Sequence, residues 1–114
     1  MPSQGDIVLI PIPFTDLSSQ KRRPVIVISN DEYNRTSPDV VVVAMTSNPT
    51  SSRYSFVISA ADLAQGALNR PGTVRVDKAY TLEKSLIVKT FGRVNERTLD
   101  RIRAALAELT GRKA

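Results

Sequence analysis

The amino-acid sequence predicts a mainly β domain with a small α content (α+β), in which a strongly bent antiparallel sheet or open barrel is followed by one C-terminal helix. Three observations predict this fold class. Six short apolar runs are separated by turn residues, and one amphipathic stretch follows them at the end of the chain. The length of 114 residues suits a single domain over residues 1–114, and no linker divides it.

The predicted strands are rich in β-branched side chains, which favour extended backbone. The third strand is the clearest, because the four consecutive valines from Val40 to Val43 indicate burial on both faces of a sheet. Pro11 and Pro13 end the first strand, since proline offers no N–H to a neighbouring strand. We expect the six strands at residues 7–12, 23–29, 39–47, 53–58, 73–80 and 86–94.

The connections between these strands are expected to contain only short helices. Residues 30–38 indicate a turn or a short helix, and residues 81–84 indicate a turn or a single helical winding. Ser59 is expected to cap another short helix, because Asp62 stands three residues later in a near-capping box and Gly66 can end it.

The clearest helix closes the chain. Asn95 can cap its N-terminus, and Glu96 is favourable in the positively polarised first turn. Four apolar residues recur on one face before Gly111, at Leu99, Ile102, Leu106 and Leu109.

The composition excludes several kinds of chemistry. The chain has no cysteine and no histidine, which rules out disulfides, thiolate nucleophiles, Cys/His zinc sites and imidazole acid–base catalysis. It also has no glycine-rich phosphate loop, so we expect neither a metal nor a nucleotide cofactor. A net charge of +5 suits a polyanionic partner such as RNA, DNA, an acidic protein or an anionic membrane, although many small basic proteins bind no nucleic acid.

Neither a signal peptide nor a membrane span is expected from the N-terminal sequence. Residues 1–6 are polar and contain no basic leader, and the apolar run at residues 7–10 is too short to cross a bilayer. We therefore expect a cytoplasmic protein with no membrane partner.

Lys21, Arg22 and Arg23 form the densest positive run, at the start of a buried strand. Pro24 biases Arg23 toward extended backbone, so its side chain is expected to be held in place. The run is either a fork that binds phosphate or a solvated turn that caps the strand with charge.

Polar residues follow the valine-rich strand without a gap, at Thr46, Ser47 and Asn48. Hydroxyl groups at the end of a strand can donate hydrogen bonds to a developing oxyanion. The same residues before Pro49 are also typical of the start of a loop.

The stretch Val74-Arg75-Val76-Asp77 places a cation and a carboxylate on one face of a strand. Side chains alternate along a strand, so Arg75 and Asp77 lie opposite the two valines and about 7 Å apart along the strand. They form either an acid–base pair or a surface ion pair of little energetic value.

The order of these segments resembles the MazF/PemK (Kid) toxins of type II toxin–antitoxin modules. Four stretches match at compatible spacing within about residues 5–109, namely residues 5–8, 23–29, 42–47 and 74–78. The resemblance implies an SH3-like small barrel, a homodimer, and metal-independent cleavage of single-stranded RNA (mRNA) at short preferred sequences. It also implies growth inhibition by a toxin that an acidic cognate antitoxin neutralises.

The mechanism that the resemblance implies is attack of a ribose 2′-hydroxyl on the adjacent phosphorus, which leaves a 2′,3′-cyclic phosphate and a 5′-hydroxyl. Arg23 matches the family's catalytic arginine, and Thr46 matches its hydroxyl donor. Arg75 and Asp77 match the Arg-x-Asp of the PemK-type members. Because arginine is too basic to act as a general base, we expect Arg23 to stabilise the phosphorane and Asp77 to accept the 2′-hydroxyl proton. The expected RNA-binding residues are Lys21, Arg22, Ser47, Asn48, Arg75 and Lys78.

The chain departs from many of these toxins in its short first loop, at residues 16–22. The family's loop histidine has no counterpart here, so no role of that residue transfers and the recognised RNA sequence stays open. Two rival functions also remain: a DNA gyrase poison of the CcdB kind on the same fold, and a barrel that binds nucleic acid without cutting it. The set of Arg23, Thr46, Arg75 and Asp77 favours the nuclease, because a pure protein binder needs none of them at strand ends.

Overall fold

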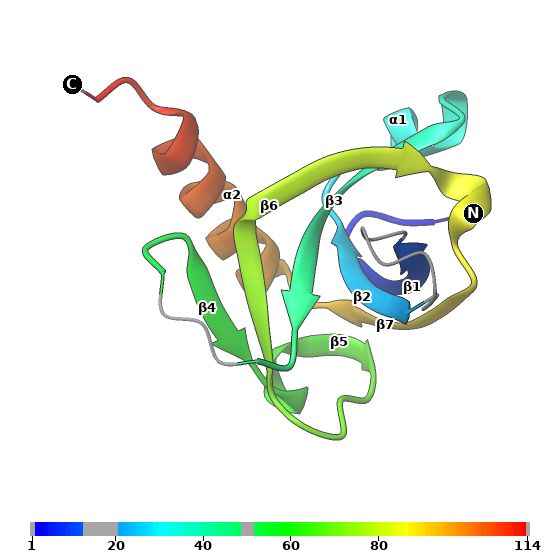
Figure 1. Ribbon diagram of the computed structural model, residues 1–114, viewed down its shortest axis with the longest axis horizontal. Helices are drawn as coiled ribbons and strands as arrows, with labels where there is room; N and C mark the ends of the chain where they lie inside the picture. The colour runs from blue at the N-terminus through cyan, green and yellow to red at the C-terminus, as the bar shows by residue number, and fades with distance from the viewer. Residues whose placement is uncertain (1, 13–20, 49–51, 114) are drawn as a thin grey trace.

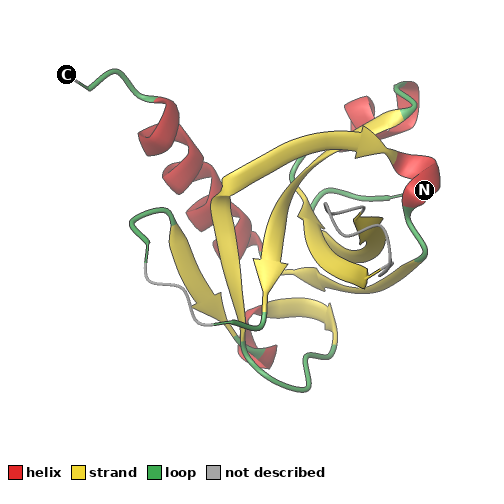
Figure 2. Cartoon of the chain, in the orientation of Figure 1, coloured by secondary structure: helices red, strands yellow, loops and turns green. Residues whose placement is uncertain are grey.

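The computed structural model describes residues 2–12, 21–48 and 52–113 of the chain, in which seven strands form one antiparallel sheet. The sheet curls on itself into a half-open barrel, and the C-terminal helix packs outside the curl (Figures 1 and 2). The strand order is β4-β6-β3-β2-β1-β7-β5, and every neighbouring pair is antiparallel. The predicted fold class is confirmed.

The strands are β1 (Asp6–Ile12), β2 (Lys21–Val27), β3 (Asp39–Thr46), β4 (Ser55–Ile58), β5 (Leu63–Gly66), β6 (Gly72–Glu83) and β7 (Lys89–Val94). The helical segments are α1 (Asp31–Thr36), the two single turns η1 (Ala60–Asp62) and η2 (Lys84–Leu86), and α2 (Glu96–Thr110). None of the helices in the described ranges is long and apolar enough to cross a membrane.

The central strands bury both of their faces, as the valine run predicts. Val40 and Val42 of β3 belong to one apolar cluster, whereas Val43 belongs to a second cluster on the other face. β1 and β2 divide their apolar side chains between the same two clusters. The second cluster also contains Leu99 and Ile102, so it fills the space between the sheet and α2.

Helix α2 has the predicted caps. The Asn95 side chain accepts a hydrogen bond from the Thr98 N–H, and Gly111 follows the last helical residue. Leu99 and Ile102 are buried, but Leu109 is 36% exposed. Leu109 lies in the last turn of the helix, and this part of the helix extends beyond the sheet (Figure 1).

The short helix predicted from Ser59 to Gly66 is wrong over most of its length. The near-capping box is present, since the Ser59 N–H donates to the Asp62 carboxylate at 2.8 Å, but the helix is one turn long. The chain then enters β5, which pairs with β7. Hydrogen bonds to a distant strand therefore outweigh the local helix signal. This strand raises the count in the described residues to seven from the expected six.

Strand β6 is longer than predicted and is bent in its middle. Val43 of β3 pairs with Ala79, but the next residue, Ala44, pairs with Arg75. Residues 76–78 of β6 are therefore accommodated in a bulge, which bends the strand (Figure 1).

Beyond the bulge, β6 continues along β3 to Glu83, so the turn predicted at residues 81–84 is instead strand over its first three residues. The helical winding follows at Lys84–Leu86, and β7 begins at Lys89 rather than at residue 86.

Candidate functional site

Several of the predicted site residues meet where β2 begins and β3 ends. They line a cavity of about 280 Å³, whose described lining is Arg22, Arg23, Pro24, Met45, Thr46 and Ser47. The predicted cation and the predicted hydroxyl donor thus share one cavity, although 22 residues separate them in the sequence.

The register of β2 against β3 explains why Arg23 and Thr46 lie at the same cavity. Val25 of β2 pairs with Ala44 of β3, and Arg23 and Thr46 each lie two residues farther along their antiparallel strands. Both side chains therefore lie on the same face of the sheet, at the same end of this strand pair.

The two side chains differ in how they are held. Arg23 is partly buried, and its Nε atom is shielded from solvent. The Thr46 hydroxyl accepts a hydrogen bond from the Asn48 N–H at 3.1 Å, so its own hydrogen can still be donated to a bound group. Ser47 and Asn48 are exposed just beyond the end of β3.

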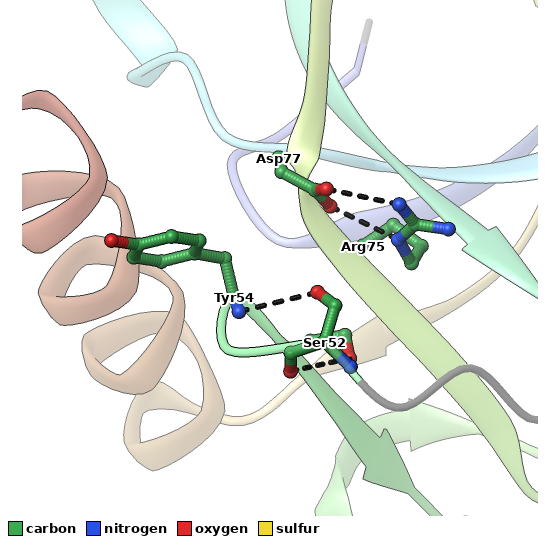
Figure 3. A network of polar contacts seen from close by, with 5 residues as sticks. Ser52, Tyr54, Arg75 and Asp77 are labelled. Atoms are coloured by element: carbon green, nitrogen blue, oxygen red, sulfur yellow. Dashed lines mark hydrogen bonds and ion pairs between the residues drawn. The ribbon is translucent and has the colours of Figure 1, made fainter.

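Arg75 and Asp77 form a two-point ion pair on β6. Arg75 donates from Nε to one Asp77 carboxylate oxygen at 3.0 Å and from Nη2 to the other at 2.9 Å (Figure 3). The two valines between which Arg75 lies are fully buried, as the alternation predicts. The hydrogen bond from Arg75 lowers the pKa of Asp77, and the same bond raises the pKa of Arg75.

This pair is fixed at the bend of β6. The Val76 N–H donates to the Tyr54 carbonyl at 2.9 Å, which ties the bulge to the residues before β4. Because Arg75 pairs with Ala44, it lies on the same face of the sheet as Thr46. Neither Arg75 nor Asp77 is among the described residues that line the Arg23–Thr46 cavity.

The remaining predicted residues lie around this region. Arg22 is exposed at the cavity, and Lys78 is exposed within the bulge of β6. Lys21 begins β2, but its side chain is outside what the structure describes, as is most of the short first loop. The described residues contain no group of three or more His, Cys, Asp or Glu side chains that could hold a metal ion.

Sequence reasoning missed a second cavity, of about 240 Å³, next to the first. The two cavities share Pro24, Met45, Thr46 and Ser47. The second is extended by residues from the loop before β6 and from β7, among them Leu68, Asn69, Arg70 and Phe91. An amide and a cation in a loop, and one aromatic side chain in a strand, carry no local signal of their own. Only the pairing of distant strands brings them beside Thr46.

Residues 3–110 match the family model described as the PemK-like, MazF-like toxin of type II toxin–antitoxin system. A search of curated proteins by sequence gave no significant match.

Solved structures share the fold. An endoribonuclease in complex with its cognate antitoxin, from a mycobacterial species, is 25% identical with a TM-score of 0.78, over 100% of this chain and 99% of that one. A second mycobacterial endoribonuclease is 26% identical with a TM-score of 0.76, over 96% and 91% of the two chains. A MazE–MazF structure from Deinococcus radiodurans is 21% identical with a TM-score of 0.79, over 98% of both chains.

Proposed function

The chain belongs to the family of PemK-like, MazF-like toxins of type II toxin–antitoxin systems, and on that premise we propose that it is a cytoplasmic endoribonuclease that cleaves single-stranded RNA. The cavity that contains both Arg23 and Thr46 carries this proposal. The two mycobacterial structures that are 25% and 26% identical to the chain are both endoribonucleases, which supports it.

The proposed reaction is an internal transfer of the phosphodiester. The ribose 2′-oxygen forms a bond to phosphorus, and the bond from phosphorus to the 5′-oxygen breaks. This gives a 2′,3′-cyclic phosphate and a 5′-hydroxyl. The intermediate phosphorane carries more negative charge than the bound diester, so groups that donate hydrogen bonds to it lower the barrier. Arg23 provides a charged donor and Thr46 a neutral one.

Two proton transfers complete the reaction. The 2′-hydroxyl proton passes to the Asp77 carboxylate, which is ionised at neutral pH as an ordinary aspartate is, and Arg75 lowers its pKa further. The lowered pKa also makes Asp77 a weak base, so its contribution depends on the orientation that the two hydrogen bonds from Arg75 impose. The leaving 5′-oxygen is far more basic than guanidine and takes its proton from Arg23.

The proposed reaction needs no metal, because the protein's own cation and hydroxyl stabilise the phosphorane. The test is incubation of the purified protein with single-stranded RNA in EDTA, followed by analysis of the RNA ends. Cleavage that leaves cyclic phosphates and 5′-hydroxyls supports the proposal. Cleavage that stops in EDTA and returns with Mg²⁺ would contradict the metal independence. RNA binding without cleavage would favour the non-catalytic barrel.

We propose two protein partners, a second copy of the chain and an acidic antitoxin. A net charge of +5 complements an acidic inhibitor, and one of the mycobacterial structures contains a cognate antitoxin. Light scattering at micromolar concentration tests the homodimer. A monomer that still cleaves RNA would contradict it.

A further inference from the structure

We propose that the second cavity, which Leu68, Asn69, Arg70 and Phe91 extend beyond Thr46, holds a nucleobase next to the scissile phosphate and determines part of the sequence preference for cleavage. The inference rests on the proposed ribonuclease function and adds a base-binding site to it.

The position of the cavity is the first support. It shares four lining residues with the Arg23–Thr46 cavity, so the two cavities are adjacent. A phosphodiester held by Arg23 and Thr46 carries a nucleoside on each side. The base on the side of the shared residues is within reach of the second cavity.

The size of the cavity is the second support. A volume of about 240 Å³ lies below the range of drug-sized sites, which suits one planar ring system. Gly72 helps to keep this space open. A Cβ atom on Gly72 would lie 3.1 Å from the sulfur of Met45, which lines both cavities, and would push that side chain.

The chemistry of the lining is the third support. Phe91 is partly buried and packs against the core, so it offers a fixed aromatic surface on which a base can stack. Asn69 is exposed, and its amide can donate to and accept from the edge of a base. The exposed Arg70 can pair with a neighbouring phosphate.

The backbone around Phe91 is closely packed. Gly66 and Gly92 pair across β5 and β7, and a Cβ atom on Gly66 would lie 2.4 Å from the Phe91 carbonyl oxygen. This contact restricts the segment that presents the ring. A base-binding site that selects among bases needs such a rigid support.

The test compares the sequences that each variant cleaves in a random RNA pool. Asn69→Ala is expected to relax the preference at one position near the cut, with cleavage of the best sequences reduced about 10- to 100-fold and cleavage of the others unchanged. Phe91→Leu is expected to reduce kcat/KM by a similar factor, and Phe91→Tyr is expected to restore it because the ring is kept.

Gln65→Ala is the matched control, since it removes an exposed amide from β5 that does not line this cavity. An unchanged cleavage pattern in Asn69→Ala and an unchanged kcat/KM in Phe91→Leu would overturn the proposal.

A second measurement does not depend on cleavage. A random seven-nucleotide RNA pool with 2′-O-methyl groups cannot undergo the 2′-hydroxyl attack, so it binds without reacting. NMR shifts of the Asn69 side-chain amide and the Leu68 methyl groups on addition of this pool are expected in the wild type, and are expected to be smaller in Phe91→Leu. RNA binding that leaves these signals unmoved would overturn the base-binding site even if the protein proves not to be a nuclease. If RNA binding shifts these signals but the protein does not cleave RNA, only the proposed function is overturned. Substitutions that weaken antitoxin binding alone would make the cavity a protein-docking site and contradict the proposal.

Discussion

The Arg75 guanidinium holds the Asp77 carboxylate by two hydrogen bonds, at 3.0 and 2.9 Å, at the bulge that bends β6. The side chains are only 21% and 28% exposed, so the pair is more sheltered than a typical surface ion pair. The arrangement fixes the direction in which the carboxylate points. It also favours the ionised form, which is the form that can accept a proton.

The first prediction concerns the pKa of Asp77. Because its ion pair with Arg75 favours the charged form, the pKa of Asp77 in the folded protein should lie below its ordinary value of 3.8. The stabilisation that this pair adds is then present above the pKa of the unfolded chain and is lost as the pH falls through the lower, folded-state pKa. A carbon-13 NMR titration of the carboxyl groups measures this value. Arg75→Gln should raise the pKa of Asp77, and an unshifted titration in that variant would show that the pair has no electrostatic effect.

The second prediction concerns the packing of α2. Ile102 is 1% exposed in the cluster between the helix and the sheet, so Ile102→Ala should lower the free energy of unfolding by about 2–5 kcal/mol. Leu109→Ala is the matched control on the same helix. It should cost less than about 1 kcal/mol because Leu109 is 36% exposed, against 1% for Ile102. Urea unfolding curves of the two variants provide the comparison, and equal losses would contradict this packing.

The third prediction concerns Gly66, whose φ of +86° is in the left-handed region. Gly66→Ala would place a Cβ atom 2.4 Å from the Phe91 carbonyl oxygen in addition to straining the backbone. The free energy of unfolding should fall by at least about 1–2 kcal/mol. Gly111→Ala, at an ordinary φ of −70°, should have a much smaller effect. Thermal unfolding of both variants tests this, and a tolerated alanine at Gly66 would mean that β5 does not pair closely with β7.

The extent to which the sequence predicts the fold depends on the range of the interactions involved. The valine run of β3 and the capped, amphipathic α2 have strong local signals, and both were predicted with boundaries within a residue or so. Strand β5 was missed because Ser59 and Asp62 give a real local helix signal. That signal extends over one turn only, and the pairing that decides the rest comes from β7, about 30 residues farther along the chain.

In the candidate site, too, some features have a local sequence signal and others depend on contacts between distant strands. The sequence places Arg23 and Thr46 at strand ends and Arg75 and Asp77 on one face of a strand, and these placements are confirmed. The approach of Arg23 and Thr46 at one cavity depends on the register of β2 against β3, which no local pattern specifies, and Arg75 and Asp77 are not among the described residues that line that cavity. Their roles in catalysis stay proposals. Asn69 and Phe91 could not be found in advance, because their place beside Thr46 arises only from the pairing of the complete sheet.

The fourth prediction separates binding from chemistry at the exposed end of the positive run. Arg22 is exposed at the cavity, so Arg22→Ala should weaken RNA binding and reduce the slope of log Kd against log salt concentration by about one unit or less. The cleavage rate at saturating protein should stay nearly unchanged. Titrations of labelled RNA at several salt concentrations measure the slope. A large fall in the saturated rate would instead place Arg22 in contact with the reacting phosphate.

The most direct measurement is single-turnover cleavage of RNA in EDTA by the wild type, Arg23→Ala and Thr46→Ala, each at saturating protein. Arg23 should interact most strongly with the phosphorane, so its removal should slow cleavage by about a hundredfold, or roughly 3 kcal/mol, while RNA affinity changes far less. Thr46→Ala should slow cleavage by a smaller factor, because a neutral hydroxyl stabilises the charge less than a guanidinium does. Cleavage by Arg23→Ala at the wild-type rate would contradict the central claim and leave Arg23 as a charged residue at the start of a buried strand.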